Sequence, residues 1–211
     1  DSVASRGLGD VYKRQIRHGQ TIWNKSGRYQ GTTDVPLSEL GYEQSKKTAE
    51  SLKNIHLDGI ISSTLDRAFQ TAKSINQYHH LQIEKSELLQ ELHFGDWEGL
   101  TYEEIENKWP GMIDEMYHHP DKLKLPNGES FLDMQKRAMK IMEDIIARGD
   151  DKTYVIVSHG AAIRTIICGF LGIPLEKSWN FSFSNAGITC MNHYIGDRTI
   201  LAFHNLTEHL K

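Results

Sequence analysis

The sequence predicts an α/β layered fold, because strand-like and helix-like segments alternate along the chain. Residues 59–62 and 153–157 are short apolar runs of the kind found in buried strands, and each is followed by apolar residues at helical spacing. The 211 residues suit one domain, at roughly 150 residues per domain. With 38% hydrophobic and 25% charged residues, the composition is globular and excludes a disordered or fibrous chain.

The first half of the chain predicts a helix, a strand and a second helix in succession. Ser38 precedes a polar helix that turns Ala49 and Leu52 inward. The run 59–62 follows as a buried strand. The next helix has one apolar face, since its apolar residues fall at positions i, i+3, i+4, i+7 and i+10: Leu65, Ala68, Phe69, Ala72 and Ile75.

The second half predicts a helix, a strand, another helix and a hairpin. Ser130 and Asp133 resemble a capping box, with Asp in place of Glu, at the start of a helix that reaches Ile145. The strand 153–157 precedes a helix that uses Ala162, Ile163, Ile166 and Phe170. Gly196 and Asp197 form the expected turn of a hairpin between residues 188–195 and 199–204.

Residues 91–128 differ from this alternation, since they hold three of the five prolines and suggest two short helices. We interpret the segment as an insertion that acts as a lid or specificity cap, because inserted segments beside a site often carry specificity. The alternative is an ordinary surface connection.

Residues 1–15 also depart from the pattern. A buried strand is expected just before Arg17, yet Lys13, Arg14 and Gln15 suit a central strand poorly, because burying unpaired polar groups is costly. We therefore expect 1–15 to be a non-native or disordered leader, and residues 16–211 to form the single domain. The alternative is a genuine polar tail with a shortened strand.

Charge and composition exclude several classes of partner. The net charge of −4 gives no basic surface for nucleic acid or an anionic membrane. The longest apolar region, 154–175, is interrupted by His159 and Arg164 and is not a membrane span. The two cysteines indicate no disulfide framework and favour a cytoplasmic location.

Histidine and arginine side chains gather where the predicted strands end. Arg17 and His18 stand at the end of the expected first strand, and His159 and Gly160 follow the strand 153–157. Arg67 follows the strand 59–62. Sites in open α/β sheets form beyond the carboxyl ends of strands, so these groups are expected to share one crevice. A single such residue is usually structural, whereas several at one edge indicate a site.

Such a pocket suits phosphate chemistry. Arginine forks match phosphate oxygens, and an imidazole kept neutral by neighbouring arginines can act as the nucleophile in phosphoryl transfer. No metal, and no cofactor, is then required. Glu91 is the candidate acid for the leaving oxygen, because a bound phosphate favours the protonated form of a nearby carboxyl group. The alternative is that Glu91 is an ordinary surface residue.

Five sequence blocks, in order, resemble the histidine phosphatase superfamily, in the branch that includes cofactor-dependent phosphoglycerate mutase. The likeness extends from Ile16 to about Asn192. The blocks are Arg17-His18-Gly19-Gln20-Thr21-Ile22-Trp23-Asn24 with 27–31 and 34–41; 62–72; Glu91-Leu92-His93-Phe94-Gly95 through Gly99; Asn127-Gly128-Glu129-Ser130 with Arg137; and Val157-Ser158-His159-Gly160.

The resemblance implies the fold and the role of each site residue. The fold would be a three-layer α/β sandwich, phosphoglycerate mutase-like, with a mostly parallel central sheet and helices on both faces. His18 would become the phosphohistidine, Glu91 would donate the proton, and Arg17, Arg67 and His159 would clamp the phosphoryl group. Asn24, Gln30, Gly31 and Gly160 would complete the substrate-binding pocket. The family needs no metal.

The sequence departs from the glycolytic mutases of this family. Those enzymes carry an arginine pair after the acid, whereas this chain has no arginine between Glu91 and Asn127. The sequence therefore favours a metal-independent phosphomonoesterase acting on small phosphorylated metabolites. The alternatives are a mutase-type phosphotransferase and a non-catalytic phospholigand-binding module. Phe94 and Trp97 could line the pocket or pack the insertion, and the apolar stretch 179–183 could be core or the interface of a homodimer.

Overall fold

The computed structural model describes residues 10–149, 152–194 and 198–211, and in this part of the chain a six-stranded sheet has the order β3-β2-β4-β1-β5-β6. Of the described strands, β5 alone runs against the rest. The strands are β1 (Asp10–Arg17), β2 (Gly59–Ser63), β3 (Ile83–Ser86), β4 (Thr153–Ser158), β5 (Ile188–Tyr194) and β6 (Arg198–Leu206).

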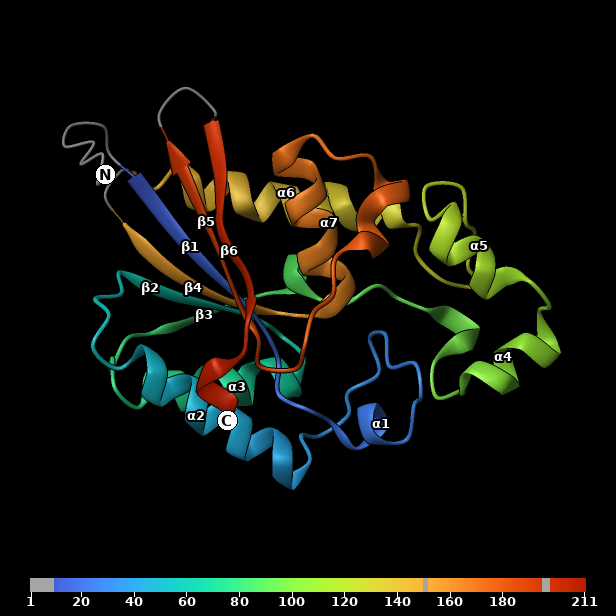
Figure 1. Ribbon diagram of the computed structural model, residues 1–211, viewed down its shortest axis with the longest axis horizontal. Helices are drawn as coiled ribbons and strands as arrows, with labels where there is room; N and C mark the ends of the chain where they lie inside the picture. The colour runs from blue at the N-terminus through green and yellow to red at the C-terminus, as the bar shows by residue number, and fades with distance from the viewer. Residues whose placement is uncertain (1–9, 150–151, 195–197) are drawn as a thin grey trace.

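Helices cover both faces of this sheet, with α2 and α3 on one side and α6 and α7 on the other (Figure 1). Side chains alternate between the faces, so that Ile60 and Val155 pack on α2 and α3, while Ile61 and Ile156 pack on α6 and α7. The predicted three-layer sandwich is thus confirmed. The helices are α1 (Ile22–Lys25), α2 (Glu39–Leu52), α3 (Asp66–Asn76), α4 (Tyr102–Lys108), α5 (Met112–His118), α6 (Phe131–Ile146) and α7 (Gly160–Leu171).

The predicted helix starts are also confirmed. The Ser38 hydroxyl accepts the Gly41 N–H at the start of α2, and the Ser130 hydroxyl accepts the Asp133 N–H at the start of α6. The C-terminal strands pair antiparallel as expected, but the expected turn at 196–197 lies outside the described residues. The edge strand β3 has no counterpart in the sequence prediction, because its four residues Ile-Glu-Lys-Ser carry only one apolar side chain.

The insertion 91–128 has a core of its own. It contains α4 and α5, which lie beyond the carboxyl edge of the sheet (Figure 1). Its buried residues Trp97, Ile105 and Met116 join Phe131 of α6 and Ala161 of α7 in one apolar cluster. The segment is therefore packed firmly on the two helices rather than attached only at its ends. Its role as a lid or cap stays a prediction.

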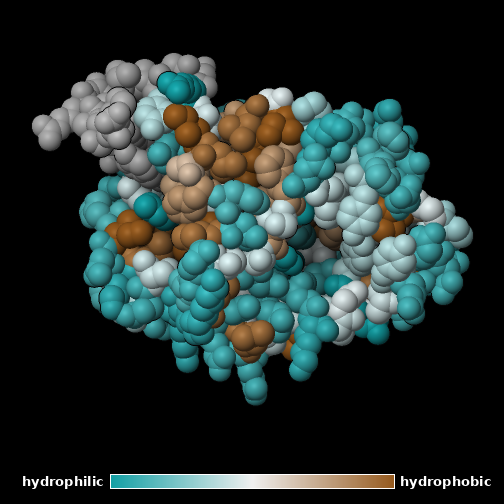
Figure 2. Space-filling view, in the orientation of Figure 1, coloured by the Kyte–Doolittle hydropathy of each residue, from teal (hydrophilic) through white to brown (hydrophobic). Residues whose placement is uncertain are grey.

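Apolar and hydrophilic side chains are distributed unevenly over the surface of the domain. Apolar side chains gather over β6 and the adjoining helical layer, whereas hydrophilic side chains cover α2 (Figure 2). No helix in the described ranges is both long and apolar enough to cross a membrane.

Strand β1 corrects the predicted domain boundary at residue 16. It begins at Asp10 and is hydrogen-bonded between β4 and β5, with Tyr12 opposite Thr153 and Arg17 opposite Ser158. Residues 10–15 therefore belong to the sheet, because strand pairing uses backbone groups and tolerates unsuitable side chains. Residues 1–9 lie outside the described part of the chain. That the segment is foreign to this fold stays a prediction.

The side chains of β1 do conflict with their position. Lys13 and Gln15 are fully buried on the face covered by α7, where the Lys13 ammonium lies 5.9 Å from the centre of the Phe170 ring. Neither the Lys13 amine nor either polar atom of the Gln15 amide has a hydrogen-bond partner among the described residues. Burial lowers the pKa of Lys13 from 10.5 to about 8. Backbone hydrogen bonds therefore hold the strand in the sheet, while its buried side chains lower the stability of the fold.

Replacing Lys13 by methionine is expected to stabilise the protein. The pKa of Lys13 is about 8 in the folded state, against the ordinary 10.5 in the unfolded chain. This difference lowers the free energy of unfolding by about 3 kcal/mol below pH 8. Between pH 8 and 10.5 the unfolded chain binds the extra proton, so the unfolding free energy of the parent rises with pH. Urea unfolding at several pH values should show that Lys13→Met has a higher free energy of unfolding than the parent near pH 7. For the variant, this free energy should not rise between pH 8 and 10.5.

Arg14→Met is the matched control, because Arg14 is on the opposite face of the same strand and is only half-buried. If both substitutions raised the free energy of unfolding equally, the loss of stability could not be assigned to the burial of Lys13.

Candidate active site

The predicted site residues meet at the carboxyl edge of the parallel strands. His18 follows β1, His159 follows β4, and Arg67 lies in the first turn of α3 beyond β2. Since β1, β4 and β2 are parallel neighbours, their ends lie side by side. The rings of His18 and His159 are 5.1 Å apart, centre to centre. These groups therefore lie together at one edge of the sheet, and Arg17, His18 and Arg67 line one cavity there.

His18 is buried and held in one tautomer. Its Nδ1 lies 2.7 Å from the Gly19 carbonyl oxygen, which can only accept, so Nδ1 carries the proton and Nε2 has a free lone pair. Burial lowers the pKa of His18 well below 6.5, and the charges of Arg67 and Arg17 lower it further. His18 is therefore a neutral imidazole, as a nucleophile must be.

Arg67 and Arg17 are anchored by carbonyl groups rather than by carboxylates. Arg67 donates to the carbonyl oxygens of Gly31 and Thr33 at 2.6 and 2.9 Å, and Arg17 donates to that of Phe183 at 2.6 Å. Burial lowers the pKa of Arg67 to about 10 and also lowers that of Arg17. Both side chains stay cationic at neutral pH, and their charge is available to an anion.

Several buried nitrogens at this site lack a partner among the described residues. They are Arg17 Nε, Arg67 Nε and His159 Nδ1. Buried N–H groups are nearly always hydrogen-bonded, so a cluster of unpaired nitrogens around His18 fits a bound oxyanion that would accept from them. His159 itself is fully buried, with Nε2 2.8 Å from the Ser63 hydroxyl. His159 is thus buried beside His18 and is not among the residues that line the cavity, so its unpaired Nδ1 is the atom through which it could bind an oxyanion.

Glu91 faces the same pocket from the opposite side. Its carboxylate oxygens accept N–H groups of Ala161 and Ala162 at 3.2 Å each, in the first turn of α7, and of Leu92 at 3.0 Å. The placement follows from the chain path, because Glu91 comes just after the 3-10 helix Glu87–Leu89, where the Leu89 carbonyl oxygen accepts the hydroxyl of Ser158 at the end of β4. The carboxyl group is thus held within the cavity that contains His18.

The remaining predicted residues take different positions. Asn24 lines the cavity, and its Oδ1 accepts from the Thr21 N–H and from Asn185 Nδ2, while its own Nδ2 has no partner among the described residues and can donate to an anion. Gln30 lines the cavity and accepts the Thr21 hydroxyl. Gly31 has φ +56°, and a Cβ there would meet the Glu98 carboxyl group.

Gly160 lies behind Arg17. A Cβ built on it would approach the Arg17 guanidinium to 3.6 Å, so Gly160 is next to the pocket without being one of its lining residues.

The cavity has a volume of about 190 Å³, which suits a phosphate with a small organic group. Phe94 and Tyr29 supply an apolar wall, whereas Trp97 is fully buried behind them and packs the insertion. Sequence reasoning missed the wall residues Gly27, Arg28 and Tyr29, although they lie within the quoted block 27–31. It also missed Asn185, which orients Asn24 from a segment without a recognised motif.

The fold and this histidine–arginine pocket are those of an enzyme that acts on phosphate groups. The family described as histidine phosphatase superfamily (branch 1) matches residues 15–206, and the chain belongs to this family. The resemblance inferred from the five blocks is therefore confirmed.

Known proteins support the assignment. Phosphoserine phosphatase 1 of Hydrogenobacter thermophilus is 35% identical over 195 residues, 92% of this chain and 92% of that protein. The structure of Bacillus stearothermophilus YhfR is similar with a TM-score of 0.90 at 31% identity, covering 95% of this chain and 100% of that one. Entamoeba histolytica phosphoserine phosphatase in complex with 3-phosphoglyceric acid gives a TM-score of 0.85 at 32% identity, covering 95% and 100%.

Acid should destabilise the protein through His18. Because its pKa in the folded state is lowered, the unfolded chain binds the extra proton below pH 6.5, and the free energy of unfolding falls as pH falls. The loss amounts to at most about 1.4 kcal/mol per pH unit for one histidine. Urea unfolding between pH 7 and 5 should show a shallower decline for His18→Asn. Equal declines for variant and parent would contradict the buried neutral state of His18.

Proposed function

We propose that this protein is a metal-independent phosphomonoesterase that hydrolyses small phosphorylated metabolites through a phosphohistidine on His18. The observation that carries the proposal is the free Nε2 of a neutral His18, surrounded by unpaired nitrogens of Arg17, Arg67 and His159 and faced by Glu91. A nucleophile, an oxyanion site and a proton donor around one phosphate-sized space are the parts that this reaction needs, and the arrangement supports the proposal.

The first step transfers the phosphoryl group. The Nε2 lone pair of His18 forms the N–P bond while the bond between phosphorus and the ester oxygen breaks. Glu91 gives its proton to that oxygen, which leaves as an alcohol. Arg17, Arg67 and His159 bind the phosphoryl oxygens, with Asn24, Gln30, Gly31 and Gly160 shaping the pocket around them.

The second step returns the enzyme to its starting state. Water attacks phosphorus, Glu91 takes a proton from that water, and the N–P bond breaks to release phosphate. His18 regains its lone pair and Glu91 its proton, so the cycle balances as ester plus water giving alcohol plus phosphate. No step needs a metal or another cofactor.

The substrate class follows from the cavity and from the relatives. Phosphoserine and 3-phosphoglycerate are small esters of the size that the cavity admits. The absence of arginine between Glu91 and Asn127 favours water over a second phosphorylated substrate as the acceptor. A cytoplasmic location, and a homodimer, stay predictions.

The phosphohistidine route predicts that His18→Ala abolishes turnover while the fold is kept. Removing a covalent nucleophile costs at least about 1,000-fold in rate. Phosphate release from a panel of phosphomonoesters, including phosphoserine, should persist in EDTA for the parent and vanish for the variant. Substantial activity in His18→Ala would overturn the proposal, and loss of the parent's activity in EDTA would overturn its metal independence.

Product analysis separates hydrolysis from the other two activities. With 3-phosphoglycerate and a bisphosphoglycerate primer, free phosphate indicates the hydrolase, whereas 2-phosphoglycerate without free phosphate indicates a mutase. Thermal stabilisation by phosphate with no turnover on any ester would indicate a binding module.

A further inference from the structure

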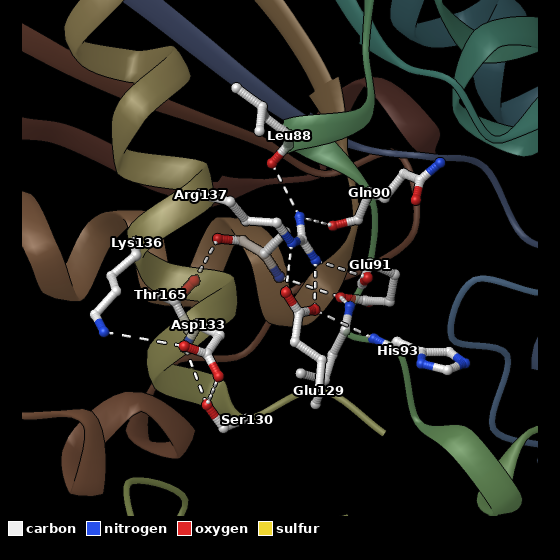
Figure 3. Close-up of polar contacts among 12 residues, drawn as sticks. Leu88, Gln90, Glu91, His93, Glu129, Ser130, Asp133, Lys136, Arg137 and Thr165 are labelled. Carbon is white, nitrogen blue, oxygen red and sulfur yellow. Dashed lines mark hydrogen bonds and ion pairs between the residues drawn. The ribbon is translucent and has the colours of Figure 1, made fainter. Parts of the chain in front are cut away.

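Arg137 of α6 is the most fully hydrogen-bonded side chain near the site, although it does not line the cavity (Figure 3). Its guanidinium donates through Nη1 to the carbonyl oxygens of Leu88 and Gln90 at 2.9 and 2.8 Å, and through Nη2 to that of Glu91 at 2.9 Å. Nε and Nη2 donate to the two carboxylate oxygens of Glu129 at 2.7 and 2.8 Å. All five N–H donors of the guanidinium are thus used.

The backbone that Arg137 binds is the segment that carries Glu91. Gln90 and Glu91 follow a short 3-10 helix, Glu87–Leu89, and have no regular secondary structure of their own. The sheet ladder therefore does not hold their carbonyl groups. Arg137 supplies the donors, and it fixes Gln90, Glu91 and the preceding 3-10 helix at Leu88 against α6.

Glu129 connects the other end of the insertion to the same place. Its backbone N–H donates to the His93 carbonyl oxygen at 2.8 Å, and its carboxylate also accepts the His93 N–H at 3.4 Å. The side chains of Arg137 and Glu129 are each only 19% exposed, so the ion pair is screened little by solvent. Both ends of the insertion 91–128 therefore meet on this pair.

Glu91 is consequently held at two points. Arg137 binds its backbone oxygen from α6, while the N–H groups of Ala161 and Ala162 bind its carboxylate from the start of α7. A carboxyl group must lie within hydrogen-bond distance of the leaving oxygen to donate a proton. Releasing the backbone from α6 would leave the carboxylate as the single point of attachment.

We propose that Arg137, paired with Glu129, is a positioning residue that holds Glu91 in place for proton transfer to the leaving group. The inference rests on the proposed function, since it assigns Glu91 as the acid. Arg137 touches no substrate, and it acts through the backbone of the segment 88–91.

A comparison of two esters tests this role. An alkyl phosphate, such as phosphoserine, releases a poor leaving group that needs the proton, whereas p-nitrophenyl phosphate releases a phenolate that does not. The ratio kcat/KM reports the steps up to formation of the phosphohistidine, so later use of Glu91 as a base does not enter it. We would measure it for the parent, Glu91→Gln, Arg137→Met and Arg137→Lys, using the fastest alkyl ester of the panel.

The expected result is a loss that depends on the leaving group. Arg137→Met should lower kcat/KM for the alkyl ester by about 10- to 100-fold, the effect of misplacing a catalytic group by about 1 Å, and for p-nitrophenyl phosphate by less than about threefold. Glu91→Gln should show the same pattern with a larger loss. Arg137→Lys keeps the positive charge but loses the planar guanidinium that makes paired hydrogen bonds. Its kcat/KM for the alkyl ester should therefore lie between those of the parent and Arg137→Met.

Arg148→Met is the matched control, because Arg148 makes a similar two-pronged ion pair with Glu84 on the surface, remote from Glu91. It should leave both esters unaffected. Glu129→Gln keeps the shape of the pair while weakening it, and serves where Arg137→Met reduces the yield of folded protein.

Equal losses on both esters in Arg137→Met or Glu129→Gln would show a merely structural role and overturn the proposal, even if His18→Ala is inactive. If Glu91→Gln shows no dependence on the leaving group, the assigned acid is wrong and the positioning role falls with it. In contrast, retained phosphate release by His18→Ala would overturn the proposed function itself, independently of the comparison of the two esters.

Discussion

The constraint on which the rest of this structure depends is the burial of two arginine side chains at the carboxyl edge of the sheet. Arg17 and Arg67 lie beside a buried neutral His18, and no carboxylate forms an ion pair with either arginine among the described residues. Burying charge is tolerated only when hydrogen bonds hold it. Carbonyl oxygens from Gly31, Thr33 and Phe183 do so, which fixes the guanidinium groups without neutralising them.

In strand β1 the backbone determines the position of the strand, whereas the side chains affect the stability of the protein. Its backbone is paired on both sides, and the register places Arg17 opposite Ser158 and so sets His18 beside His159. The buried Lys13 and Gln15 raise the free energy of the folded state, and β1 nevertheless pairs with β4 as far as Arg17, directly before His18. Backbone pairing therefore positions the nucleophile even where the side chains of the strand lower the stability of the protein.

Much of the fold and most of the site could be predicted from sequence, and the exceptions have a common cause. Alternating apolar runs predicted the layers, and residues at strand ends predicted His18, Arg67 and His159, because parallel strands end at one edge. Glu91 came from the family resemblance. The patterns could not show that His159 is fully buried, or that Asn185 orients Asn24. Such details depend on contacts between distant loops, which have no periodicity to detect.

The same limit explains Arg137. Its place in a recognised sequence block marks it as important, but a block cannot say that one guanidinium binds the carbonyl groups of Leu88, Gln90 and Glu91 and the far end of an insertion. The arrangement divides the site in two. The nucleophile and the phosphate-binding arginines are attached to strand ends and α3, and the acid is attached to α6 and α7. In the proposed mechanism the phosphate would lie between these halves, so that the sheet would position the bond that breaks and the helical layer would deliver the proton.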